Sequence, residues 1–376
     1  MNMLDYLDWR GDLTFQERDL NEVDNLIFST LAYLRMEGYI SPDGRRSLTI
    51  GELRDACAAA GIDTSDTACD PMRLLQRAAD TERFRPVQVC CYTSLSDSSQ
   101  VVQFAAVTFR YGPDRSYIAF RGTDNTLVGW REDCNFSYLV QTPGQSAAAE
   151  YIRKVAAMTE DLFFVGGHSK GGNFAVYGSA FCGEPVRSSR ILQVYSNDGP
   201  GFNSDIAGSA EYLSILGKLV KIIPESSIVG ILLSSRARRK VITSTAKGIA
   251  QHNPYSWNVQ AAGFEEADGR NLSSLLLDSA LSSWITSLEP RDKQLIIDTL
   301  FDALESSGAE TVKDLGSQKT AVALSVLKAG LQVDPDRRRE IAGTFRNIFT
   351  AGKDTLVSET VKELETLLGR NGNISG

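Results

Sequence analysis

Residues 162–173 read Leu-Phe-Phe-Val-Gly-Gly-His-Ser-Lys-Gly-Gly-Asn, an apolar run followed by glycines on both sides of one serine. The apolar run predicts a short buried strand, and the small residues after Ser169 predict a helix. Between them, residues 167–171 match the pattern G-x-S-x-G, in which a sharp strand-to-helix turn exposes a serine hydroxyl above a sheet. This context favours a catalytic serine over a tight turn with an incidental serine.

Predicted strands and helices alternate on both sides of this turn. Apolar β-branched and aromatic stretches predict strands, and amphipathic or small-residue stretches predict helices. The strands are expected at residues 87–92, 101–111, 116–121, 162–165, 191–195, 219–223 and 240–244, and the helices at 146–159, 170–182 and 205–216. Together with the serine turn, this alternation predicts the α/β class and an α/β-hydrolase fold, with a mostly parallel sheet covered by helices on both faces.

The ends of the chain are predicted to be helical. Amphipathic patterns cover residues 20–34 and 50–60, and the pattern becomes helical again after the last predicted strand. We therefore predict three parts, which are an N-terminal helical segment packed on the core (1–85), an α/β-hydrolase core (86–265) and a C-terminal helical region (266–376).

The composition limits the class of protein. A chain of 376 residues with 42% hydrophobic and 23% charged residues is typical of globular proteins with a sizeable core. The net charge of −8 argues against a surface for nucleic acid. The six cysteines lack metal-binding spacing, and two histidines are too few for a zinc pattern. We therefore expect no metal and no organic cofactor.

The chain lacks the features of a membrane or secreted protein. Its first residues show neither the basic start nor the apolar run of a signal peptide, and charged residues and a proline interrupt the apolar stretch 219–233. The adjacent thiols of Cys90 and Cys91 suit a reducing compartment, so we expect a cytoplasmic protein. The basic cluster 236–240 is best interpreted as a solvated turn, with a transient contact at an anionic membrane surface as the alternative. The sequence leaves the oligomeric state open.

A nucleophilic serine needs a base, and histidine is the usual one. His168 precedes Ser169 within the turn, so its side chain is expected to point away from the serine hydroxyl. His252 follows the last predicted strand in a loop that contains Pro254. This is the place of the base in the chain order Ser, Asp or Glu, then His. We therefore predict that His252 is the base.

Two carboxylates lie between the serine and this histidine at the ends of predicted strands. Asp198 follows the strand 191–195, within Ser-Asn-Asp-Gly-Pro, and Glu225 follows the strand 219–223. A carboxylate at either place could orient the imidazole of His252. We prefer Asp198 and keep Glu225 as the alternative acid, since Asn-Asp-Gly-Pro is also a common turn sequence.

Two backbone N–H groups are candidates for an oxyanion hole. One is that of Lys170, the residue after the nucleophile. The other is that of Thr123 in Phe-Arg-Gly-Thr-Asp, where a predicted strand ends at a glycine. A plain turn is an equally good interpretation of that second stretch. Aromatic residues in the segment 127–139 could line an acyl pocket or a lid, or pack under the sheet.

These motifs resemble known families. Residues 120–123 and 167–172 together are similar to the arrangement in class 3, fungal-type lipases. A longer set resembles the Mbeg1-like family of bacterial proteins, and it consists of residues 119–124, 128–130, 167–173, 196–202, 227–230 and 251–252. This resemblance extends from the N-terminus to about residue 265. It implies an α/β-hydrolase fold and hydrolase activity, and it leaves the substrate undefined.

The chain departs from class 3 lipases at the acid of the triad. Those lipases carry the acid at a strand end that corresponds here to about Ser227, and no aspartate stands at that position. The acid must therefore come from Asp198 or Glu225, or the triad is incomplete.

The function expected from these residues is a serine hydrolase that cleaves a carboxylic ester of a lipid or another small acyl compound. Ser169 attacks the acyl carbonyl, His252 takes its proton, and Asp198 orients His252. The same residues would serve an acyltransferase, a thioesterase or a peptidase. A non-catalytic, hydrolase-like binding protein is the alternative from another class.

Overall fold

The computed structural model describes residues 1–60, 70–99, 101–123, 131–132, 135–136, 139, 141–227 and 229–269. The chain divides into two compact units, of which one comprises Met1–Asp124 with Val140–Arg270 and the other Asn125–Leu139 with Asn271–Gly376. Almost all described residues belong to the first unit. The predicted C-terminal helical region lies outside the described residues, so the three-part division stays a prediction.

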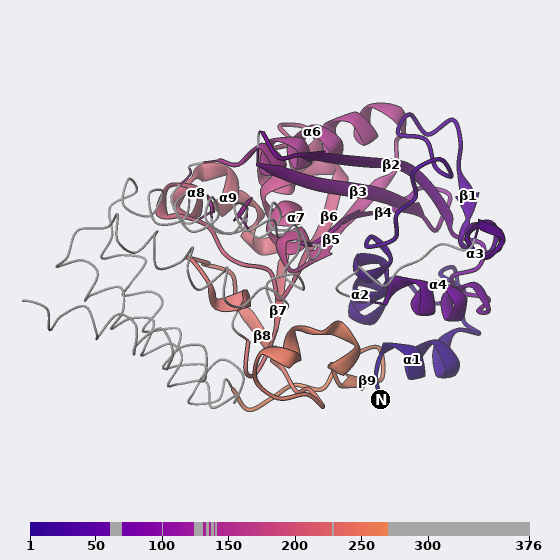
Figure 1. Cartoon of the computed structure of the whole chain (residues 1–376). Coiled ribbons are helices and arrows are strands. Elements are labelled where there is room, and N and C mark those ends of the chain that lie inside the picture. Colours follow the sequence, from indigo (N-terminus) through magenta and orange to yellow (C-terminus); the bar gives the residue numbers. More distant parts are fainter. Residues whose placement is uncertain are drawn as a thin grey trace, which may run out of the picture. The chain divides into compact units, whose positions relative to one another are not determined.

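The centre of the first unit is a mixed β-sheet whose strands follow the order of the sequence, β1 to β8 (Figure 1). Neighbours from β1 to β4 are antiparallel, and neighbours from β4 to β8 are parallel. The strands are β1 (Leu48–Thr49), β2 (Gln88–Asp97), β3 (Val102–Arg110), β4 (Arg115–Phe120), β5 (Leu162–His168), β6 (Ile191–Asn197), β7 (Leu219–Pro224) and β8 (Arg239–Ile242), with a separate antiparallel pair β9 (Val259–Gln260) and β10 (Gly263–Phe264). This architecture confirms the predicted α/β class and its mostly parallel sheet.

The helices form two groups in the sequence, one before β2 and one between the parallel strands. They are α1 (Met3–Arg10), α2 (Glu22–Leu31), α3 (Ile50–Ala60), α4 (Pro71–Ala79), α6 (Pro143–Met158), α7 (Lys170–Phe181), α8 (Ser204–Gly208) and α9 (Ala210–Ile215). Short 3₁₀ or π turns complete the list as η1 (Val186–Arg190), η2 (Leu216–Lys218), η3 (Val229–Ile231), η4 (Gly248–His252) and η5 (Pro254–Ser256).

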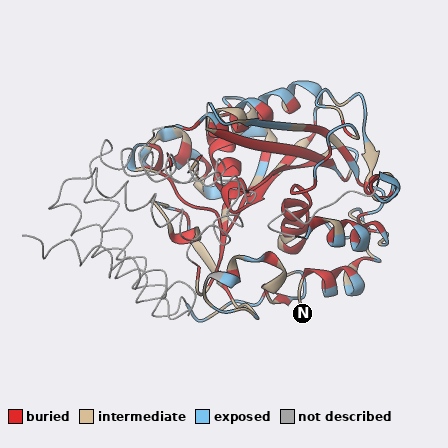
Figure 2. Cartoon of the chain, viewed as in Figure 1, coloured by how far each residue is buried: buried red, intermediate tan, exposed pale blue. Residues whose placement is uncertain are grey.

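The strand order decides which helices cover which face. From β4 to β8 the order never reverses, so right-handed connections place all the intervening helices on the same face of the sheet. There α6 packs along α7, and α9 packs on α7. The other face is covered by α2, which contacts β4 and β5 (Figure 1). The central strands β3 to β7 are mostly buried between these two layers (Figure 2).

Two element boundaries differ from the sequence prediction. The helix expected from residue 146 begins at Pro143, because Thr142 and Gln145 form a capping box that precedes the apolar pattern. The single helix expected at 205–216 is two short helices, because the extended backbone of Ser209 separates them and its hydroxyl caps α9.

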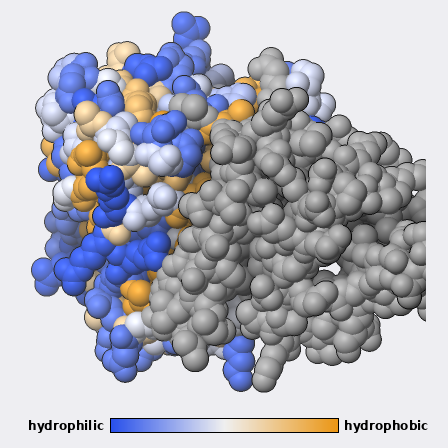
Figure 3. All heavy atoms as spheres, turned by 90° about the vertical axis from the view of Figure 1, so that its left-hand side faces the viewer, coloured by the Kyte–Doolittle hydropathy of each residue, from blue (hydrophilic) through white to orange (hydrophobic). Residues whose placement is uncertain are grey.

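None of the described helices combines the length and the apolar character needed to cross a membrane. The first part of the apolar stretch 219–233 forms β7, a mostly buried strand between β6 and β8. On the side of the described surface seen in Figure 3, hydrophilic residues predominate and hydrophobic residues form smaller patches between them.

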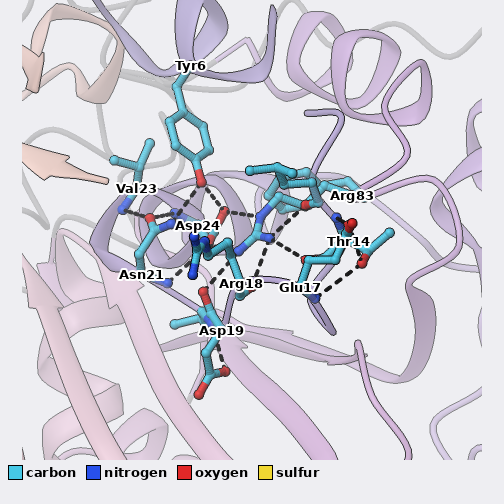
Figure 4. Close-up of polar contacts among 12 residues, drawn as sticks. Tyr6, Thr14, Glu17, Arg18, Asp19, Asn21, Val23, Asp24 and Arg83 are labelled. Atoms are coloured by element: carbon cyan, nitrogen blue, oxygen red, sulfur yellow. Dashed lines mark hydrogen bonds and ion pairs between the residues drawn. The ribbon is translucent and has the colours of Figure 1, made fainter. Parts of the chain in front are cut away.

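The N-terminal helices are joined by a buried ion pair between Arg83 and Asp24 (Figure 4). Both side chains are fully buried, and the guanidinium donates to the two carboxylate oxygens at 2.9 and 2.5 Å. The Tyr6 hydroxyl donates to Asp24 Oδ1 at 2.9 Å. The other guanidinium N–H groups donate to the backbone carbonyls of Leu13, Thr14, Arg18 and Asp19. The pair therefore holds the segment between α1 and α2 against the residues after α4.

Replacing Arg83 with methionine is expected to lower the free energy of unfolding by about 3–5 kcal/mol, because it leaves Asp24 buried without its cation. Urea denaturation followed by tryptophan fluorescence measures this change. The control is Arg45→Met, whose side chain is 89% exposed and pairs with Asp43. Its loss should be at most about 1 kcal/mol. Equal losses in the two variants would contradict the role given to the buried pair.

Candidate active site

Ser169 stands between the end of β5 and the start of α7, in a strained conformation. Its φ of 59° and ψ of −132° lie where residues with a side chain are rare. The backbone N–H of Ser169 donates to the carbonyl of Asn197 at 2.9 Å, and its carbonyl accepts from Gly172 N–H at 2.9 Å. The first bond ties the strained turn to the end of β6, and the second ties it to the first turn of α7. This is the geometry expected for the turn of a G-x-S-x-G motif.

Two glycines let the end of β4 approach this turn. A Cβ at Gly171 would lie 2.1 Å from the Phe120 carbonyl oxygen, and one at Gly122 would lie 2.6 Å from the His168 carbonyl oxygen. Real Cβ atoms do not come so close to backbone atoms, so both positions require glycine. The end of β4 and the start of α7 are thereby packed against each other.

Thr123 and Lys170 occupy equivalent places at the ends of neighbouring parallel strands. Phe120 of β4 is paired with Gly167 of β5, and each candidate donor follows three residues later. Both are buried, with Thr123 8% exposed. The backbone N–H of Lys170 belongs to the first turn of α7, where N–H groups have no acceptor within the helix. The arrangement thus brings both predicted oxyanion donors to the end of the sheet where Ser169 lies.

His252 and Asp198 form a close pair. His252 Nδ1 lies 2.6 Å from Asp198 Oδ2, although 54 residues separate the two in the chain. The Asp198 side chain is fully buried, and the His252 side chain is 27% exposed. Asp198 directly follows Asn197, the residue that accepts the hydrogen bond from Ser169 N–H. The pair therefore lies next to the serine turn.

Asp198 is held in place on its other side as well. Its Oδ1 accepts a short hydrogen bond from the Ser227 hydroxyl and another from Gly230 N–H at 3.1 Å. Burial opposes ionisation of Asp198, but the hydrogen bond and charge of His252, together with Ser227, outweigh it and keep the pKa of the carboxyl below its usual value. Asp198 is therefore an ionised carboxylate at neutral pH.

Glu225 is not brought to this pair. It follows β7 as expected, and its backbone N–H donates to Ile242, but its carboxylate makes no hydrogen bond within the described part of the chain. At Ser227, where the resemblance to class 3 lipases predicted an acid, the side-chain hydroxyl donates to Asp198. A hydroxyl at the end of β7 thus supports a carboxylate at the end of β6.

The Ser169 hydroxyl makes no hydrogen bond to His252 or to other described residues. The two residues are nevertheless near each other, because the His252 ring lies 4.6 Å, centroid to centroid, from the ring of His168, which immediately precedes the serine. Hydrogen bonds between a nucleophile and its base commonly shorten only when substrate binds. The structure therefore places the serine beside the histidine–aspartate pair without closing the last contact.

His168 supports the loop that carries His252. Its Nε2 lies 2.8 Å from the His252 carbonyl oxygen, and its Nδ1 lies 3.1 Å from the Tyr33 hydroxyl. A carbonyl oxygen only accepts, so Nε2 carries the proton and Nδ1 accepts from Tyr33. Burial, with the nearby His252, lowers the pKa of His168 to about 3. His168 is therefore neutral at physiological pH and acts as a fixed donor.

Helix α2 also reaches this end of the sheet. The amide groups of Asn25 and Asn197 donate to each other's oxygens at 2.9 and 3.0 Å, and the Tyr117 hydroxyl donates to Asn25 at 2.6 Å. All three side chains are buried. Together with Tyr33, these contacts attach α2 to the residues directly before Ser169 and Asp198.

Sequence reasoning missed two supporting residues of the site, Tyr33 and Asn25, and singled out Ser227 only as a position that lacks an aspartate. Tyr33 and Asn25 belong to no motif, and for all three residues only their partners in space reveal their roles. The sequence also predicted that the aromatic segment 127–139 lines an acyl pocket, forms a lid or packs under the sheet. Most of this segment lies outside the described residues. Phe136 is buried in the structure.

A mostly parallel sheet with a strained serine at a strand-to-helix turn, and a histidine–aspartate pair beside it, defines an α/β-hydrolase fold. The sequence model of the Mbeg1-like family matches residues 78–302. This match covers more than half of the chain, and the chain belongs to the Mbeg1-like family. A comparison with curated protein sequences finds no significant match.

Solved structures similar to this chain include lipases. The native propeptide complex of Rhizomucor miehei lipase is 17% identical over 59% of this chain and 68% of its own, with a TM-score of 0.37. A deletion mutant of that complex is 14% identical over 65% of this chain and 79% of its own, with a TM-score of 0.39. M37 lipase is 13% identical over 57% of this chain and 70% of its own, with a TM-score of 0.36.

Two isosteric substitutions test which of the two candidate acids acts in the triad. Asp198→Asn is expected to slow the reaction of Ser169 with a fluorophosphonate probe by about 10³-fold or more, because the amide cannot stabilise a protonated His252. Glu225→Gln is the matched control and should leave the rate close to that of the unaltered protein. Time courses of labelling measure both. If only Glu225→Gln slowed the labelling strongly, Glu225 and not Asp198 would be the acid.

Proposed function

We propose that this protein is a serine hydrolase that cleaves the carboxylic ester of a lipid or another small acyl compound. The observation that supports this best is the 2.6 Å contact between His252 and a buried, ionised Asp198, next to the strained turn of Ser169. A buried carboxylate is costly unless it is paired, and here its partner is a histidine that remains partly exposed. Such a pair is what a serine nucleophile requires.

The proposed reaction starts when the Ser169 hydroxyl attacks the acyl carbonyl and His252 Nε2 takes its proton. Asp198 accepts from Nδ1–H, which leaves Nε2 free to act as the base and stabilises the imidazolium that forms. The backbone N–H groups of Thr123 and Lys170 receive the oxyanion. The imidazolium then protonates the leaving alcohol, and a second cycle with water releases the acid from the acyl-enzyme.

Lys170 would act in this scheme through its backbone alone. Its Nζ is buried at 3.2 Å from Gln103 Oε1 on β3, and this contact directs the long side chain along the sheet. The backbone N–H is left at the positive end of α7, where the helix dipole favours a developing negative charge.

We also propose a cellular location and a class of partners for this protein. Cys57, Cys90, Cys91 and Cys182 are free thiols, which suits a cytoplasmic protein. We propose a small-molecule acyl or lipid substrate and no nucleic-acid partner, in keeping with the net charge of −8. Neither a metal nor an organic cofactor has a part in the proposed steps.

The test is fluorophosphonate labelling of the full chain, with p-nitrophenyl esters from acetate to palmitate assayed in parallel. Ser169→Ala should abolish labelling, and both Ser169→Ala and His252→Ala should lower ester turnover by about 10³-fold or more. Ser188→Ala, at an exposed serine, is the control and should change neither. Peptide mapping should place the probe on Ser169.

A folded protein that neither labels nor turns over any ester, with and without detergent, would contradict the proposal. That result would favour a hydrolase-like binding protein. Adding alcohol or thiol acceptors distinguishes a hydrolase from an acyltransferase, because an acyltransferase would pass the acyl group to them in preference to water.

A further inference from the structure

Lys221 is a buried lysine that the proposed reaction does not use. It lies on β7, paired with Ser196 of β6 on one side and Arg239 of β8 on the other. Only 3% of its surface is exposed. Its Nζ donates to the Gly199 carbonyl at 2.8 Å, which is the one hydrogen bond that the described residues offer it. A buried lysine with a single backbone partner is unusual, since burial of an amine costs free energy unless it is well paired.

The partner of Lys221 is the turn that carries the proposed acid. Asp198 has a left-handed backbone, with a φ of 49°, and its N–H donates to Ile222 of β7 at 2.8 Å. The next residue, Gly199, has no room for a side chain, because a Cβ would lie 2.9 Å from the Ser169 carbonyl oxygen. The turn is therefore confined between the serine turn on one side and Lys221 on the other.

The Asp198 carboxylate can reach its partners only while the backbone of this turn keeps its conformation. Its carboxylate must meet His252 with one oxygen and Ser227 with the other. A left-handed residue without a glycine's freedom relaxes to another conformation unless its surroundings hold it. The hydrogen bond from Lys221 to the following carbonyl is a direct restraint of this kind.

We propose that Lys221 is a positioning residue for the triad acid: by donating to the Gly199 carbonyl, it holds the strained turn in which Asp198 presents its carboxylate to His252. This inference rests on the proposed function of the site. Lys221 itself touches neither the substrate nor the reacting atoms in this role.

The protonation of Lys221 supports this role. Burial lowers the pKa of Lys221 to about 7; Arg239 acts in the same direction and Asp198 against it. These are the charged groups that face Lys221 from β8 and from the end of β6. At pH values well above this pKa the amine is neutral, and it still has an N–H to donate to Gly199. Lys221 therefore supplies a hydrogen-bond donor to the Gly199 carbonyl without placing a permanent positive charge beside Asp198.

The lowered pKa of Lys221 makes its contribution to stability depend on pH. Between pH 7 and the ordinary lysine pKa of 10.5, the unfolded chain binds a proton at this residue that the folded chain lacks. The contribution of Lys221 to stability therefore rises with pH across that range. Lys221→Met removes this rise, so the difference in melting temperature between the two proteins should shift in favour of the unaltered one from pH 7 to pH 9.5.

The main experiment compares Lys221→Met with the unaltered chain and with Lys154→Met, a control at an exposed lysine on α6. We expect Lys221→Met to remain folded at pH 8 and to label with the fluorophosphonate probe about 10-fold more slowly or worse, a loss typical of a misplaced catalytic group. Lys154→Met should label at the normal rate. Lys221→Gln, which keeps a neutral N–H donor on a shorter side chain, should recover part of the lost rate.

A second readout does not depend on activity. The proton on His252 Nδ1, hydrogen-bonded to Asp198, should give a downfield proton NMR signal that His252→Ala removes. Lys221→Met should shift or broaden this signal, and Lys154→Met should leave it unchanged. An unchanged signal together with an unchanged labelling rate in folded Lys221→Met would overturn the inference, as would a loss of labelling that only follows a loss of folded protein. If the unaltered chain fails to label, the proposed hydrolase function fails, and the NMR comparison still decides whether Lys221 positions Asp198.

Discussion

The constraint on which this structure depends is the strand order of its sheet. Because β4 to β8 follow one another without a reversal, their connecting helices all lie on one face, and the other apolar face has to be covered by something else. Helix α2 provides that cover, with the Phe28 ring 4.8 Å from Phe109 and 5.1 Å from Tyr117. The buried pair of Arg83 and Asp24 anchors α2, and it can do so because every one of its donors finds an acceptor.

The same helix connects the fold to the chemistry proposed for it. Asn25 fixes Asn197 at the end of β6, and Tyr33, just after the end of α2, holds His168 in the serine turn. Asp198 and Ser169 each directly follow one of these anchored residues. A helix that closes the core therefore also sets the ends of the two strands that carry the proposed acid and nucleophile. Burying so many polar groups costs stability, and proteins commonly accept this cost at functional sites.

Much of the site could be predicted because its signals are local. The serine turn follows from glycine spacing after an apolar strand, and His252 follows from its place after the last strand in a chain with only two histidines. The acid could not be settled in this way, since Asp198 and Glu225 both stand at strand ends. The helix expected at 205–216 was wrong as a single element, because the hydroxyl of Ser209 starts a second helix there.

The sequence by itself determined the α/β class, the strained serine turn and the candidate base, because hydrophobic periodicity and turn chemistry are properties of neighbouring residues. Only the tertiary structure decided which carboxylate meets His252, and that Ser227 and Lys221 gather around it. These contacts need atoms within about 3 Å of each other. Such distances are set by the register of β6 against β7 and by the path of the loop that carries His252, neither of which any short stretch of the chain specifies.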